Sequence, residues 1–213
     1  MTSMNRNSVF AQIGTLVLIA SLFVGVSFLA HVYQSDISYL LHTRGWVSIA
    51  GFILLTAIFV VFVIPLDVVL LIPIGAVVWG PVPTAIMSIT GWTIGAAVAF
   101  GIGRWFGESV VGMLIGTTRI HAIERRIPKT NLFWGVVALR MLVSVDILSY
   151  ALGIFSTMPL GRYLLATAIG VLPFGFYFAY AGTLPLAYQV LALALALSLA
   201  MVALVQYGIR REP

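Results

Sequence analysis

Residues 64–80 read IPLDVVLLIPIGAVVWG, and this stretch decides the fold. Asp67 is the only charged side chain between positions 45 and 103. One proline stands at the second position of the stretch and another follows directly after it, so the stretch is too short to cross a bilayer, which takes about 20 residues. Broken backbone is tolerated at membrane depth only where protein or a water-filled cavity covers it. We therefore expect residues 65–80 to form a re-entrant segment.

The composition is that of an integral membrane protein. Apolar residues make up 62% of the 213 residues and charged residues only 8%, whereas a soluble domain carries roughly 25% charged residues. Folding in water cannot hide this much apolar surface, so lipid must be the solvent. The net charge of +5 does not indicate nucleic acid. The basic residues lie mostly in residues 108–131 and at the C-terminus, where membrane topology and anionic headgroups explain them.

No metal or other cofactor is expected. The sequence contains no cysteine, which excludes disulfides, thiol chemistry and cysteine-ligated metal. The three histidines, His31, His42 and His121, are scattered near the ends of apolar segments. A metal site needs ligands that converge.

We expect an all-α polytopic fold with about five transmembrane helices and two opposed re-entrant segments. The second re-entrant segment is 132–155, which is apolar but contains Arg140 and Asp146. The polar stretch 108–131 is either an interfacial helix or a solvated loop. Its basic residues predict that this stretch and the C-terminal tail are cytoplasmic. The expected full spans are 9–30, 46–64, 84–106, 163–183 and 186–207, with 31–44 as a polar connection.

Small residues recur at every fourth position of the third expected span. They are Gly91, Gly95, Ala99, Gly103 and Gly107. This spacing puts all of them on one helix face, where another backbone can approach closely. The pattern therefore predicts a helix-packing surface.

The two halves of the chain contain nearly the same spacing of aspartate and glycine residues. In each half an aspartate is followed after seven or eight residues by a glycine, and 24 residues after the aspartate by another glycine. Duplicated broken segments in membrane transporters point to a midplane site between inverted repeats. We therefore expect an inverted repeat. The matched positions are Asp67, Gly75 and Gly91 in the first half and Asp146, Gly153 and Gly170 in the second.

The charges inside the membrane are the candidate site. A charge at the bilayer centre costs roughly 2.5–3.5 kcal/mol, so it persists where it is paired or faces water or a polar ligand. Arg140 and Asp146 are six residues apart and point to different faces of a continuous helix, so we favour a pair between Arg140 and Asp67. The arginine fork suits a phosphate as well as a carboxylate, and the aspartates could carry a coupling proton. Arg104 is a weaker candidate for the same substrate or ion path, because a residue near a helix end can extend its charge to the membrane interface. The alternative is a structural ion pair that joins the two re-entrant segments.

A set of short motifs occurs in order along the chain. They are 64–67 (IPLD), Gly75, Gly80, 103–107 (GRWFG), Arg140, Asp146, 150–153 (YALG), 165–170 (LATAIG), Pro173 and 180–182 (YAG). Over about residues 46–183 these motifs resemble the DedA/VTT-domain superfamily, also called SNARE-associated Golgi proteins. The resemblance implies two opposed re-entrant loops in inverted repeats. It also implies lipid movement between leaflets, as scrambling in eukaryotic relatives and as carriage of polyprenyl-phosphate or phospholipid in bacterial ones.

The expected function is a membrane lipid transporter. It would be a flippase or scramblase for phospholipid or polyprenyl-phosphate-type lipid, with proton coupling as an option. Its partners would be lipids with anionic phosphate headgroups, and its location a bacterial inner (plasma) membrane. The alternatives are a secondary transporter for a small anion and a non-transporting assembly factor. An enzyme is not expected, because the membrane segments lack a nucleophile motif with a partner histidine. The expected divisions are 1–45 (N-terminal helix and connection), 46–183 (DedA/VTT-like core) and 184–213 (C-terminal helix and basic tail).

Overall fold

The computed structural model describes residues 6–42, 45–64, 67–115, 131–142, 145–195 and 198. All regular structure within these residues is helical. The elements are α1 (Arg6–Val32), α2 (Gln34–His42), α3 (Trp46–Val61), the π-helical turn η1 (Asp67–Leu71), α4 (Ile72–Trp79), α5 (Pro81–Ile115), α7 (Leu132–Leu142), α8 (Val145–Phe155), α9 (Leu160–Thr183) and a further helix, Leu186–Leu195.

Two of the described helices are long and apolar enough to cross a bilayer, Pro81–Glu108 and Leu160–Thr183. A third span is present if the bent pair Val17–Val32 and Gln34–Leu41 counts as one. This is fewer than the five full spans expected from the sequence. The difference arises because α3 ends at Val61 after 16 residues, which is about 24 Å of helix. The last expected span, 186–207, lies only partly within the described residues.

The region expected as a polar connection, 31–44, is mostly helical. α2 follows α1 after a single turn residue and is bent by 80° from it. Ile37, Leu40 and Leu41 in α2 have the spacing of one helix face, so the sequence is that of an amphipathic helix. The polar residues between them led to the expectation of a loop. The segment 116–130 and the basic C-terminal tail, for which a cytoplasmic position is expected, lie outside the described residues.

Helices α3 and α5 run parallel in close contact. A Cβ added to Gly91 would lie 2.7 Å from the Cβ of Thr56, and one added to Gly95 would lie 2.6 Å from the carbonyl oxygen of Ala57. Residue numbers rise together along both helices, so the segment between them must run back. That segment, Asp67–Trp79, is 13 residues long and spans about 20 Å, short of a bilayer. Gly80, with φ of 84°, makes the turn into α5.

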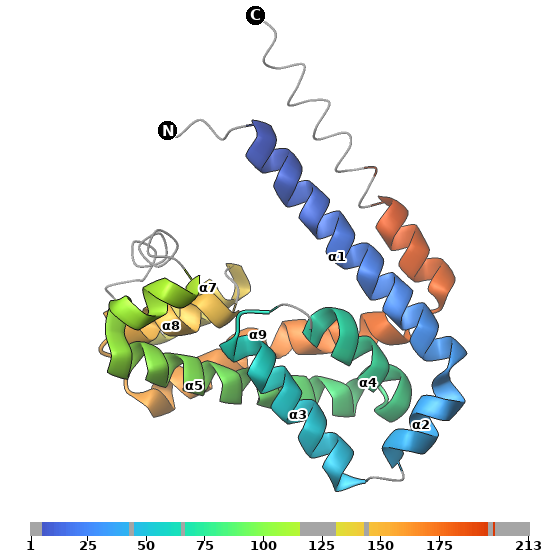
Figure 1. Cartoon of the computed structure of the whole chain (residues 1–213), viewed down its shortest axis with the longest axis horizontal. Helices are drawn as coiled ribbons and strands as arrows, with labels where there is room; N and C mark the ends of the chain where they lie inside the picture. Colours follow the sequence, from blue (N-terminus) through green and yellow to red (C-terminus); the bar gives the residue numbers. More distant parts are fainter. Residues whose placement is uncertain are drawn as a thin grey trace, which may run out of the picture.

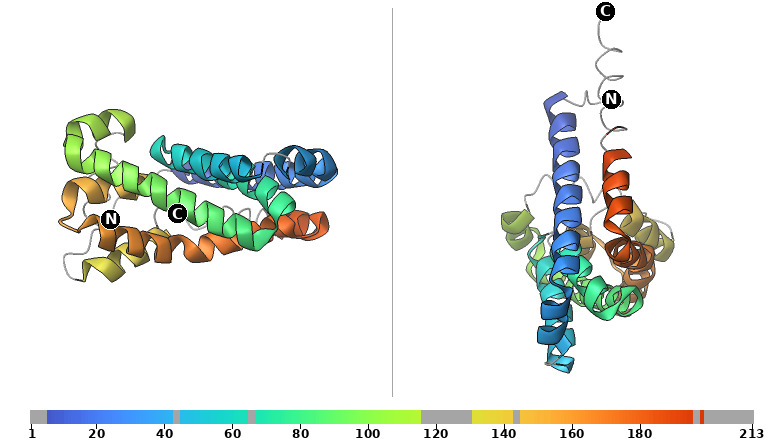
Figure 2. Two further views of the ribbon diagram at one scale, coloured as in Figure 1. Left: turned by 90° about the horizontal axis from the view of Figure 1, so that it is seen from below. Right: turned by 90° about the vertical axis from the view of Figure 1, so that its right-hand side faces the viewer.

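The long helices α5 and α9 lie side by side and antiparallel (Figures 1 and 2). The ring of Tyr163 at the start of α9 stacks on Phe100, with centroids 4.2 Å apart. Further along α9, Gly175 approaches Ile89, which is earlier in α5. The short helix α4 packs against α9, and α8 packs against α5. α1 and the Leu186–Leu195 helix project together from this core (Figure 1).

Candidate functional site

Asp67 begins the π-helical turn η1 and is buried, with 5% of its surface exposed. Its carboxylate accepts a hydrogen bond from the indole N–H of Trp92 on α5. Pro73 explains the wide turn, because it has no N–H for the carbonyl of residue 69 and its ring crowds that carbonyl. The broken backbone thus places a carboxylate inside the helix bundle.

Arg140 lies near the end of α7 and is 2% exposed. Its Nη2 lies 2.6 Å from the hydroxyl of Tyr163, 3.1 Å from that of Thr167 and 3.1 Å from that of Ser149. The guanidinium carbon is also 5.5 Å from the centroid of the Tyr163 ring. These hydroxyls are neutral acceptors and bind a guanidinium less strongly than a charged oxygen does.

Both charged side chains are linked to α5, Asp67 through Trp92 and Arg140 through Tyr163. Tyr163, which accepts from Arg140, donates to the carbonyl oxygen of Ala96 at 3.2 Å. Trp92, which holds Asp67, is one helical turn earlier, a rise of about 6 Å along α5. A direct Asp67–Arg140 contact was favoured from the sequence. Within the described part of the chain, Asp67 instead bonds to Trp92, and the direct contact is not formed. Asp146 lies in α8, and its side chain is outside the described residues.

Sequence reasoning missed the partners of both charges. Trp92 was not singled out, and neither were Ser149, Tyr163 and Thr167. One signal was available, since Tyr163 and Thr167 are four residues apart and therefore share a face of α9. The contribution of Ser149 depends on how α8 folds back on α7, which no local pattern indicates.

Arg104 has a different position from the other candidates. Its side chain is exposed, and it donates to the carbonyl oxygens of Gly153 at 2.9 Å and Ser156 at 2.6 Å. Its guanidinium carbon lies 4.6 Å from the centroid of the Phe100 ring. The carbonyls at the end of a helix lack intrahelical donors and carry partial negative charge. Arg104 therefore caps the C-terminal end of α8.

Of the remaining candidate glycines, three lie at contacts between helices and one lies at a kink in α5. Gly103 and Gly153 meet where α5 crosses α8, and a Cβ on Gly153 would collide with the carbonyl oxygen of Phe100. Gly107 has no described atom within 4 Å of an added Cβ, and its φ of 67° interrupts α5. Gly107 thus forms a kink rather than part of the packing face. Gly170 lies against α7, where an added Cβ would be 2.6 Å from the Cβ of Arg140.

A family model described as VTT domain matches residues 64–184. The match begins just before η1, ends just after α9, and contains both Asp67 and Arg140. Comparison with curated proteins and with solved structures finds no match. Together with its apolar spans, the family match identifies an integral, multi-pass membrane protein.

Proposed function

This chain belongs to the VTT domain family, and from that premise we propose that it moves lipids between the leaflets of its membrane. The substrate would be a phospholipid or a polyprenyl-phosphate-type lipid, carried by a flippase or scramblase mechanism, with proton coupling as an option. The membrane would be a bacterial inner membrane. The core that carries this function would extend over 46–183, between an N-terminal part (1–45) and a C-terminal part (184–213).

The observation that carries the proposal is the burial of two opposite charges inside the helix bundle. Asp67 is bonded to Trp92 on α5, and Arg140 donates to hydroxyl groups on α8 and α9. Charges at membrane depth are costly, roughly 2.5–3.5 kcal/mol each on insertion scales, and they mark substrate paths when they persist. A lipid phosphate oxygen would bind the Arg140 fork more strongly than a hydroxyl does. We assign the path to Asp67, Arg140 and Asp146. Arg104 would line its outer end.

The proposed architecture is an inverted repeat with two opposed re-entrant segments, 65–80 and 132–155. Three features support it. The long helices α5 and α9 are antiparallel. The matched glycines pack on the helices that precede the short helices α4 and α8, Gly91 on α3 and Gly170 on α7. Each short helix, α4 or α8, packs on the long helix of the other half. Inverted repeats of broken helices hold substrate at their interface.

The repeat is chemically unequal at its centre. Gly91 lies against Thr56 and the carbonyl of residue 53, while Gly170 lies against Arg140 and the carbonyl of residue 137. Thr56 in the first half therefore occupies the position of Arg140 in the second. Only the second half therefore has a cation at this matched position, and Arg140 would bind a single phosphate there.

The test is lipid movement by the purified chain in liposomes. Phospholipid with a fluorescent headgroup is placed in both leaflets, and a membrane-impermeant reductant is added outside. We expect the chain to expose inner-leaflet label to the reductant, whereas protein-free liposomes keep it protected. Movement of inorganic phosphate without movement of lipid would overturn the proposal and favour the small-anion transporter.

A further inference from the structure

Tyr163 is a fully buried tyrosine near the start of α9, and its hydroxyl group joins Arg140 to α5. The hydroxyl oxygen lies 2.6 Å from Nη2 of Arg140 and 3.2 Å from the carbonyl oxygen of Ala96. A carbonyl can only accept, so the hydroxyl donates its hydrogen to Ala96 and offers its lone pairs to the guanidinium. Tyr163 thus connects a cation on α7 to the backbone of α5.

The ring of Tyr163 is itself held in place by packing. It stacks on the ring of Phe100 with centroids 4.2 Å apart, and neither side chain is more than 3% exposed. The phenolic oxygen lies on the axis about which the ring flips, so a ring flip does not move it. Close packing around the ring therefore fixes the position of the oxygen that faces Arg140.

Three hydroxyl oxygens compete for Nη2 of Arg140, which carries two hydrogens. The Tyr163 oxygen is the closest of the three at 2.6 Å, whereas those of Ser149 and Thr167 are both at 3.1 Å. The serine and threonine oxygens also move with rotation about a single side-chain bond. Of these three groups, Tyr163 is therefore the strongest restraint on the guanidinium.

We propose that Tyr163 is a positioning residue, which orients the Arg140 guanidinium so that its planar fork faces the lipid phosphate. This inference rests on the proposed lipid transport and adds a residue to it. An arginine side chain has several rotatable bonds, and immobilising it when a ligand binds weakens the complex. Because Tyr163 orders the guanidinium beforehand, less free energy is lost when the phosphate binds.

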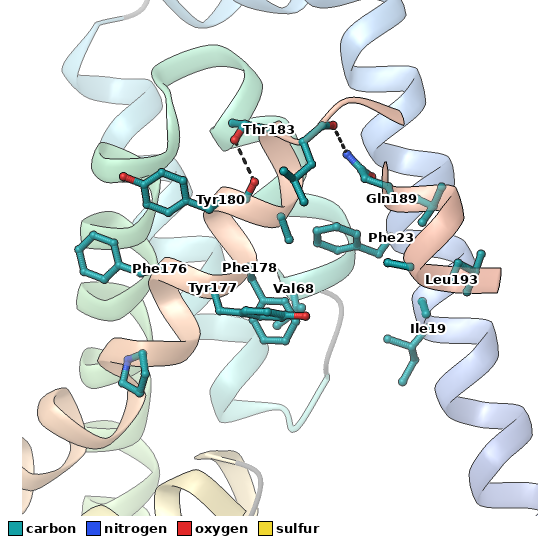
Figure 3. Close-up of a pocket in the computed structure, with 16 residues that line it drawn as sticks. Ile19, Phe23, Val68, Phe176, Tyr177, Phe178, Tyr180, Thr183, Gln189 and Leu193 are labelled. Carbon is teal, nitrogen blue, oxygen red and sulfur yellow. Dashed lines mark hydrogen bonds between the residues drawn. The ribbon is translucent and has the colours of Figure 1, made fainter. Parts of the chain in front are cut away.

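Two other tyrosines provide controls for Tyr163→Phe, which keeps the ring and removes the hydroxyl group. Tyr150 is also fully buried, and its hydroxyl donates to the backbone carbonyl of Val61 at 2.6 Å. Tyr150→Phe therefore removes a comparable buried bond to a helix carbonyl, on α3 rather than α5. Tyr177 is on α9 like Tyr163, but it is 68% exposed and lines a pocket between α1, α9 and the Leu186–Leu195 helix (Figure 3). Tyr177→Phe therefore controls for a hydroxyl lost from the surface of the same helix.

The first measurement is independent of transport. The full chain is labelled with ¹³C and ¹⁵N in its arginine guanidinium groups and studied by NMR in detergent, and the Arg140 signals are identified by their loss in Arg140→Gln. A guanidinium held by hydrogen bonds gives separate signals for its two terminal nitrogens, whereas rotation averages them. We expect separate signals in the unmodified chain and in Tyr150→Phe, and averaged signals in Tyr163→Phe. Separate signals in Tyr163→Phe would overturn the proposal.

A second variant covers the case in which Tyr163→Phe does not fold. Phe100→Leu keeps the Tyr163 hydroxyl but removes the ring that stacks on it. It should average the Arg140 signals as well, and separate signals in this variant would overturn the proposal in the same way.

The second measurement is transfer of phospholipid with a fluorescent headgroup in proteoliposomes, at increasing mole fractions of that lipid. Tyr163→Phe should raise the half-saturating fraction about fivefold, the cost of ordering one long side chain on binding, and should keep the maximal rate per folded protein. Tyr150→Phe and Tyr177→Phe should keep the unmodified half-saturating fraction. A lower maximal rate at an unchanged half-saturating fraction would overturn the positioning role. Absence of transfer by the unmodified chain would overturn the proposed function instead, and the NMR signals would still decide whether Tyr163 orders Arg140.

Discussion

The indole N–H of Trp92 donates a hydrogen bond to the carboxylate of Asp67, which lies 25 residues earlier in the chain. This bond ties the broken segment η1 to the long helix α5. Both residues are buried, so water does not compete for either group. The only charged residue between positions 45 and 103 thus has a fixed position against α5.

Trp92→Phe should destabilise the protein and lower lipid transfer. Phenylalanine fills most of the same volume but has no donor, so it leaves a buried carboxylate without its bond, at a cost of about 1–3 kcal/mol. The unfolding midpoint in detergent measures the first effect and a liposome assay the second. Trp105→Phe is the matched control, since Trp105 is 83% exposed. Equal midpoints for the two variants would show that the Trp92 bond does not contribute to stability.

A comparison of two glycines in α5 tests close helix packing. An added Cβ on Gly95 would lie 2.6 Å from the backbone oxygen of Ala57, whereas one on Gly101 meets no described atom within 4 Å. Gly95→Ala should therefore separate α3 from α5 and lower the unfolding midpoint. Gly101→Ala should leave it unchanged or raise it slightly, because alanine favours helix by up to about 1 kcal/mol. The opposite order would place the Gly95 face in lipid.

Loss of the Arg104 side chain should weaken the end of α8. Arg104→Met removes the bonds to the carbonyls of Gly153 and Ser156, which should cost about 1 kcal/mol. Arg162→Met is the control, because Arg162 is an exposed arginine on α9. We expect transfer per folded molecule to fall less for Arg104→Met than for Arg140→Gln. An equal loss would make Arg104 part of the central site.

The sequence indicated the break in the chain around Asp67 and the family, because prolines, glycines and isolated charges act locally. The family match confirms the resemblance. Partners across the bundle could not be predicted in the same way. Asp67 bonds to Trp92 rather than to Arg140 because α4 folds back beside α5, and that geometry depends on tertiary contacts. Hydropathy also does not show that α3 stops at Val61, which makes it shorter than the expected span 46–64.

The central claim is that Arg140 binds a lipid phosphate, and variants of Arg140 test it most directly. Arg140→Lys keeps the charge but loses the planar fork, whereas Asp67→Asn with Arg140→Gln removes both charges. Because Asp67 and Arg140 do not contact each other, a purely structural role predicts that each single variant loses stability and that the two losses add in the double variant.

The deciding measurement is lipid transfer in proteoliposomes, normalised to folded protein, for Arg140→Lys and for the double variant. Our account predicts at least a tenfold loss for Arg140→Lys, about 1.4 kcal/mol of lost phosphate interaction, and no transfer by the double variant. Full transfer by the folded double variant would contradict it.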